Sequence, residues 1–209
     1  AAAVDRLLQD LEELLEQEHV GGIHPAGIDL AVQFKDQATK RIDIADYEHA
    51  VRLWTVVLEV SVMMAQFPSR EIAQRSYDFR TLGLGYANIG GLLMNMGLGY
   101  DSDQGRALCG ALTAIMTGVA YATSAEMAAE LGAFPGYARN AGHMLRVIRN
   151  HRAAAHGTGE YEAVNVNPVE LDVDNCPDPQ LATMAQRAWD KALALGEEHG
   201  FRNAQTTVI

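Results

Sequence analysis

A glycine-rich block in the middle of the chain constrains the fold more than any other feature. Residues 79–99 contain six glycines in 21 positions. Each glycine costs a helix about 1 kcal/mol relative to alanine, so this block is not a stable isolated helix. Glycines at this density are typical of backbone that passes close to another element or to a ligand. We therefore expect the block to lie at such a close approach.

Helical patterns dominate the rest of the chain. Apolar residues recur at helical spacing from Ile44 to Gln66, where Pro68 ends the helix. Ser69 is expected to cap a short helix that runs through Tyr77. Three further helices are predicted over 101–131 (with Asp101 and Gln104 as a capping box), 137–151 and 179–198 (after the N-cap Asp178). Small residues every three or four positions in 101–131 indicate close helix packing.

Short strands are expected near residues 28–34 and 205–209, with a polar turn over 35–41. The predicted fold class is therefore mainly α, with a strand fragment at each end. Such strands fit a piece of a larger α/β fold in which their neighbours lie outside this chain. Residues 1–27 read as an acidic amphipathic helix and a linker. That helix is either a surface cap or a partner-binding helix that makes a homo-oligomer through residues 4–18.

Charge and composition exclude several classes of protein. A net charge of −11 repels polyphosphate, so binding to DNA or RNA polymers is not expected, although a small nucleotide is not excluded. No apolar run reaches the roughly 18–20 residues of a membrane span, and the first residues show no secretory signal. The missing initiator Met indicates processing or trimming. Cys109 and Cys176 form no CxxC motif, which favours reduced thiols in a cytoplasmic protein over a disulfide.

Side-chain spacing alone defines no catalytic or metal site. Residues 83–88 lack the third glycine and the preceding strand of a dinucleotide-binding loop. His143, His151 and His156 lie among arginines, which disfavour a bound cation, so surface or capping roles are expected.

Two groups of charged residues are expected to form ion pairs. Residues Arg146, Arg149 and Arg152 form a basic cluster for which salt bridges are the expected role and phosphate binding the alternative. Glu126 and Glu130 lie one helical turn apart, but the Glu-x-x-His motif of a diiron bundle is absent. They therefore indicate an ion-paired or solvated helix face.

From about Tyr47 to Ile209 the chain resembles the adenosylcobalamin-dependent (class II) ribonucleotide reductases. The matching blocks occur in the order of that family. They are Ala65–Pro68, Arg80–Asn88, Thr123–Ala128, Phe134–Tyr137, His143–His151, Asn175–Asp178 and Gly200–Gln205.

The resemblance implies a parent fold and a chemistry. The parent fold is a ten-stranded α/β barrel, of which residues 28–209 would be a fragment, whereas residues 1–27 do not resemble the family. In the parent, adenosylcobalamin generates a thiyl radical that reduces a ribonucleotide, and a thioredoxin-type donor restores the thiols. Neither Cys109 nor Cys176 matches a redox position of the family. The chain is therefore expected to bind no adenosylcobalamin tightly and to be inactive without the remaining reductase segments.

Three residues are candidates for substrate binding in the parent. Arg80, Arg202 and Asn203 lie beside the glycine-rich block and the final strand, and purely structural hydrogen bonding is the alternative role. An alternative function is a non-catalytic helical scaffold or interaction protein that reuses this segment.

Overall fold

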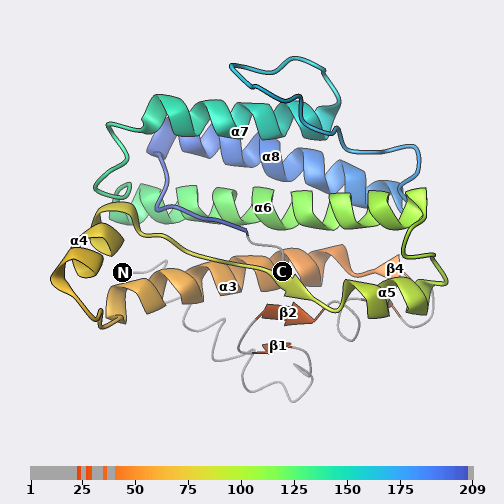
Figure 1. The fold of residues 1–209 in the computed structure, drawn as a ribbon, viewed down its shortest axis with the longest axis horizontal. Helices are drawn as coiled ribbons and strands as arrows, with labels where there is room; N and C mark the ends of the chain where they lie inside the picture. Colours follow the sequence, from red (N-terminus) through yellow and green to blue (C-terminus); the bar gives the residue numbers. More distant parts are fainter. Residues whose placement is uncertain (1–22, 25–26, 30–34, 37–40, 207–209) are drawn as a thin grey trace.

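A computed structural model describes residues 23–24, 27–29, 35–36 and 41–206 of the chain (Figure 1). The predicted helix within residues 1–27 therefore lies outside the described residues. The described helices are α3 (Ile44–Met64), α4 (Arg70–Phe79), α5 (Ile89–Met96), α6 (Asp103–Leu131), α7 (Ala141–His156) and α8 (Pro179–His199).

The short strands form two small sheets. They are β1 (Ile23–His24), β2 (Gly27–Asp29), β3 (Lys35–Asp36), β4 (Arg41–Ile42) and β5 (Tyr86–Ala87). In the first sheet β1 pairs antiparallel with β2, and β2 pairs parallel with β5. Leu84, just before β5, forms a parallel bridge with Thr206. Three chain segments thus run parallel, in the order β2, the segment 84–87 that ends in β5, and the segment that ends at Thr206. Helices α3 and α4 lie between the first and second segments in sequence, and α5 to α8 lie between the second and third. In the second sheet β3 pairs antiparallel with β4. Both ends of the polar turn predicted over 35–41 are therefore strand residues, and residues 37–40 lie outside the described part of the chain.

This pairing corrects the expectation that the two terminal strands lack neighbours in the chain. The segment that ends in β5 lies between them and pairs with both β2 and Thr206. That strand was missed because Gly83 and Gly85 interrupt the apolar pattern. Leu82, Leu84 and Tyr86 are all buried, and their spacing of two is that of a strand. The described residues form no closed barrel, and residues 30–34 and 207–209 of the predicted strands lie outside them.

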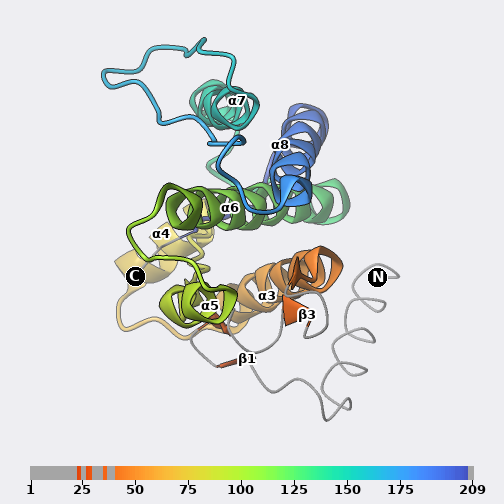
Figure 2. The ribbon, with the colours of Figure 1, turned by 90° about the vertical axis from the view of Figure 1, so that its right-hand side faces the viewer.

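The helices stack in layers around α6. Figures 1 and 2 show α6 in the middle, with α7 and α8 on one side and α3 and α5 on the other. Helix α6 packs closely on α8, because a Cβ atom at Gly118 would lie only 2.8 Å from the Cβ of Ala188. This contact confirms the close helix packing predicted from the small residues of α6. Side chains of the core, such as Tyr47, Leu112 and Trp189, are almost completely buried.

Most helix ends follow the predicted caps, and two do not. The side chains of Ser69 and Asp178 accept hydrogen bonds at the N-termini of α4 and α8, as expected. Helix α6 is capped by Ser102, whose Oγ accepts from the Gly105 N–H at 3.0 Å, so the proposed capping box at Asp101 is wrong. Helix α7 starts later than predicted, because turns occupy the residues before Ala141, and it continues to Gly157, which has the left-handed conformation.

Helix α6 corrects the expectation that no apolar stretch of the chain is long enough to span a membrane. By length and composition alone it is long and apolar enough to cross a membrane. Of its most apolar stretch, 67% is buried inside the protein, as in the core helix of a soluble protein. Burial against α3 and α8 therefore accounts for its composition.

Candidate functional site

A buried carboxylate gathers two of the three predicted substrate-binding residues. Glu59 on α3 is 2% exposed, and its Oε1 lies 2.7 Å from the Nη2 of Arg80 and 2.7 Å from the Nη2 of Arg202. The Nε of Arg80 donates to Oε2 at 3.0 Å, and the Nε of Arg202 donates to Oε1 at 2.9 Å. We call these three residues the Glu59 cluster.

Backbone carbonyls provide further acceptors for the two arginines of the Glu59 cluster. One carboxylate faces two guanidinium groups, so the side chains alone carry a net positive charge. Arg80 is the C-cap of α4, with a φ of 45°, and its Nη2 also donates to the Glu59 carbonyl. Arg202 donates from Nη1 to the carbonyl of Gly132 at the end of α6. The C-terminus of α6 carries partial negative charge and stabilises the Arg202 guanidinium, and the Glu59 carbonyl gives Arg80 a further acceptor within α3.

Asn203 lies beside the Glu59 cluster and is held by hydrogen bonds that involve backbone carbonyls. Its φ of 85° is tolerated by asparagine better than by most residues. Its Nδ2 donates to the Phe79 carbonyl at 2.6 Å, and its own carbonyl accepts from Ser124 Oγ at 2.8 Å. Asn203 therefore ties the end of α4 to α6.

The structure thus brings Arg80, Arg202 and Asn203 together, and each is engaged by protein acceptors. All three precede the parallel strands in sequence and so lie at their amino ends. In α/β folds ligands bind at the carboxyl ends of parallel strands, whereas the amino ends serve stability. The arrangement favours the structural alternative, and substrate binding by these residues stays a prediction.

Glu59 is not among the residues predicted for a site. It is the one charged residue in an otherwise uncharged stretch from Leu53 to Met64. A single acid on the apolar part of a helix is the signal of a buried partner, because buried carboxylates are paired. Its partner Arg202 is 143 residues away in sequence, and this pairing is not visible from the sequence.

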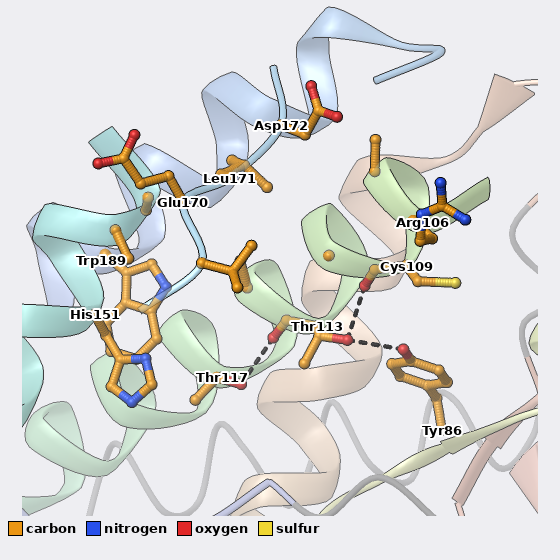
Figure 3. Close-up of a pocket in the computed structure, with 16 residues that line it drawn as sticks. Tyr86, Arg106, Cys109, Thr113, Thr117, His151, Glu170, Leu171, Asp172 and Trp189 are labelled. Carbon is orange, nitrogen blue, oxygen red and sulfur yellow. Dashed lines mark hydrogen bonds between the residues drawn. The ribbon is translucent and has the colours of Figure 1, made fainter. Parts of the chain in front are cut away.

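A separate cavity of about 630 Å³ lies between α6, α7, α8 and the loop over 157–175 (Figure 3). Small and hydroxyl-bearing residues of α6, such as Thr113 and Thr117, line it, together with Cys109. Its charged lining residues are Glu170, Asp172 and Arg106. Two acids against one base give the cavity a negative balance, which disfavours a phosphate group.

His151 and Trp189 stack face to face in this cavity (Figure 3). Their ring centroids are 4.8 Å apart, and the planes differ by 4°. His151 is exposed at the edge of the cavity, but stacking on Trp189 removes water from one face of its ring. This desolvation lowers the pKa of His151 below its usual value, because it disfavours the charged imidazolium. His151 is therefore a neutral packing residue at neutral pH.

The pKa of His151 predicts a pH dependence of stability. Its pKa is lower in the folded protein than the unfolded value near 6.5, so the unfolded chain binds more protons below that pH. The contribution is fully present above pH 6.5 and is lost as the pH falls through the folded pKa. We expect the urea midpoint of wild type to drop between pH 7 and pH 5, and to drop less in His151→Phe, which keeps an aromatic ring on Trp189.

Exposed His143, on the same helix, provides the matched control. The replacement His143→Gln is expected to leave the slope of stability against pH as in wild type. Equal slopes for wild type and His151→Phe would show that His151 does not contribute to the pH dependence.

Several of the other charged residues singled out in the sequence form ion pairs with side chains elsewhere in the protein. Arg149 binds Glu162, and Arg152 binds Asp190, which also contacts His156. Glu126 bridges Arg52 and Lys191. The predicted salt bridges are thereby confirmed for Arg149, Arg152 and Glu126. Within the described part of the chain, no three His, Cys, Asp or Glu residues are grouped to hold a metal ion.

Neither cysteine has the environment of a reactive thiolate. Cys109 and Cys176 are both free. Burial raises the pKa of each thiol, the opposite of the shift that activates a nucleophilic cysteine. Cys109 lies within helix α6 and Cys176 in the loop before α8, as the sequence predicted.

The chain belongs to the ribonucleotide reductase family, because residues 26–209 match the family model described as the ribonucleotide reductase barrel domain. Its similar proteins include vitamin B12-dependent ribonucleotide reductases. The chain is 74% identical over 179 residues to that of Agrobacterium fabrum and 71% identical over 177 residues to that of Bradyrhizobium diazoefficiens. It is 41% identical over 186 residues to that of Streptomyces avermitilis.

These similarities cover most of this chain and a small part of each relative. The matches span 85%, 84% and 88% of the chain, but 14%, 14% and 18% of the respective relatives. The resemblance to B12-dependent reductases is thereby confirmed at the level of the family.

The cavity beside His151 and Trp189 does not fit the B12 coenzyme. The cavity of about 630 Å³ has the size of a site for a small organic ligand, whereas a corrin ring with its nucleotide tail is much larger. His151, the histidine in its lining, is stacked on Trp189. We therefore assign no step of cobalamin chemistry to these residues.

Proposed function

We propose that this chain forms part of the catalytic barrel of a B12-dependent ribonucleotide reductase. The carrying observation is the family match over residues 26–209, together with relatives 74% and 71% identical that bear this name. In this proposal the parent protein converts ribonucleotides to deoxyribonucleotides by thiyl-radical chemistry in the cytoplasm. Adenosylcobalamin is its cofactor, and a thioredoxin-type protein is its reductant.

The arrangement of strands supports this role. Three parallel segments with helical crossovers are what a section of an α/β barrel contains. The amino ends of two of them, the segments that follow Arg80 and Arg202, are held by the Glu59 cluster and Asn203. Their carboxyl ends, after Ala87 and Thr206, are where an α/β fold places its chemistry. The chain thus contributes framework, and we propose that the reacting cysteines come from other segments of the parent.

A reconstitution assay tests this proposal. A full-length reductase that carries this segment is given a ribonucleoside di- or triphosphate, a dithiol and adenosylcobalamin, and deoxynucleotide is measured by chromatography. We expect product only when adenosylcobalamin is present. Equal product without the coenzyme, or none with it under either phosphorylation state, would contradict the proposal.

The alternative of a non-catalytic scaffold rests on residues 4–18 as its interaction element. Those residues lie outside the described part of the chain, so this alternative and the homo-oligomer it implies stay predictions. Removing residues 1–27 and measuring the mass by light scattering would separate the two roles.

A further inference from the structure

Two neighbouring parallel strands are linked at their amino ends by a single oxygen atom. Oε1 of Glu59 lies 2.7 Å from the Nη2 of Arg80, which precedes the first strand, and 2.7 Å from the Nη2 of Arg202, which precedes the second. The strands themselves meet through the parallel bridge of Leu84 with Thr206. The Leu84 N–H donates to the Gln205 carbonyl at 2.9 Å.

The spacing along both strands is the same. Arg80 lies four residues before Leu84, and Arg202 lies four residues before its bridge partner Thr206 (84 − 80 = 206 − 202). Both guanidinium groups contact the same carboxylate oxygen and so lie at the same level. A slip of one residue would move one arginine by about 3.3 Å and turn every side chain of that strand to the other face. Such a slip is incompatible with the contacts of Glu59.

The burial of the Glu59 cluster makes this link strong. The side chains of Glu59, Arg80 and Arg202 are 2%, 7% and 11% exposed. Water therefore screens these charges poorly, and a neutral residue at position 59 would leave two guanidinium groups side by side without a carboxylate. The side-chain contacts at the amino ends of these strands hold the same register as the Leu84–Thr206 bridge.

We propose that Glu59 is a positioning residue that sets the register of these two strands and so places their carboxyl ends for ribonucleotide reduction. This inference rests on the proposed function, because it assumes that the carboxyl ends border the reacting substrate. Glu59 touches neither substrate nor cofactor in this account. It acts through Arg80 and Arg202.

Hydrogen exchange on the 209-residue chain tests the register directly. In Glu59→Gln the amide of Leu84 is expected to exchange about 100-fold faster than in wild type, because its acceptor on the neighbouring strand is no longer held. Glu126→Gln is the matched control, since Glu126 also binds two basic residues but contacts helices only. It is expected to leave Leu84 exchange unchanged. Unchanged Leu84 exchange in folded Glu59→Gln would overturn the proposal.

Kinetics of a full-length reductase carrying this segment test the effect on catalysis. We expect kcat of Glu59→Gln to fall at least about tenfold with a smaller change in KM, because misplacement by about 1 Å is costly for the chemical step. Glu59→Asp, which keeps the charge, is expected to recover part of kcat. Leu108→Ala is the control for a general loss of stability, because it removes a fully buried side chain of α6. Leu108 lies about four helical turns from Ser124, the residue of α6 that contacts Asn203. Leu108→Ala is expected to keep kcat at temperatures where it is folded.

The outcomes separate the two proposals. A wild-type reductase that is inactive with adenosylcobalamin contradicts the proposed function, whereas the Leu84 exchange result stands independently. A folded Glu59→Gln with wild-type kcat, or a Leu108→Ala with the same loss of kcat, overturns the role of Glu59 in positioning. If Glu59→Gln does not fold, Arg202→Lys is measured instead. Lysine keeps the positive charge but cannot donate through two nitrogens to Glu59 as Arg202 does. Arg202→Lys is therefore expected to speed Leu84 exchange and lower kcat, each by less than Glu59→Gln does.

Discussion

Glu59→Ala is expected to lower the free energy of unfolding by about 3–5 kcal/mol, the range found when one partner of a buried ion pair is removed. The replacement leaves Arg80 and Arg202 buried without their carboxylate, and the carbonyl partners that remain cannot neutralise both charges. Urea titration followed by circular dichroism measures the loss. A loss below about 1 kcal/mol would show that the Glu59 cluster is solvated in solution.

Two variants show whether the loss comes from uncompensated charge. Glu126→Ala removes a carboxylate that is 30% exposed and also binds two cations, and it is expected to cost about 1 kcal/mol or less. Replacing Glu59, Arg80 and Arg202 together by methionine removes every charge of the Glu59 cluster. The triple variant is expected to be more stable than Glu59→Ala, because apolar residues of similar size replace buried ions at little net cost.

Trp189→Ala is expected to lower the free energy of unfolding by about 3–5 kcal/mol and the melting temperature by roughly 10 °C. Trp189 is 2% exposed, stacks on His151 and packs near Tyr121, with ring centroids 6.3 Å apart. Its removal opens a space between α6, α7 and α8. Differential scanning calorimetry of the 209-residue chain measures the change.

Tyr77 provides a control of similar chemistry for Trp189. This aromatic side chain is 62% exposed on α4, so Tyr77→Ala is expected to change stability by less than about 0.5 kcal/mol. Equal losses for the two variants would mean that the packing of α7 and α8 on α6 does not stabilise the fold.

The helices were predictable because their signals are local. Apolar spacing placed α3, and a run of small residues at helical spacing marked α6. Ser69 and Asp178 marked two helix starts as N-caps. The boundaries that failed depended on competing local bonds, such as Ser102 in place of Asp101 at the start of α6. A cap is decided by which side chain reaches the free N–H groups, and neighbouring polar residues compete for them.

The sheet and the site were less predictable because their contacts are distant in sequence. Alternating burial at Leu82, Leu84 and Tyr86 is a strand signal, but the glycines between them hid it. The structure brings Arg80, Arg202 and Asn203 together, and their expected role in substrate binding stays a prediction. Their common partner Glu59 was not found, because nothing local links it to an arginine 143 residues away.

We propose that this chain supplies barrel framework and that ribonucleotide reduction needs residues from the rest of the parent protein. The most direct measurement incubates the purified 209-residue chain with a ribonucleotide, adenosylcobalamin and a dithiol, alongside a full-length reductase that carries the same segment. We predict deoxynucleotide from the full-length protein and none above background from the 209-residue chain. Coenzyme-dependent deoxynucleotide production by the 209-residue chain alone would contradict the account.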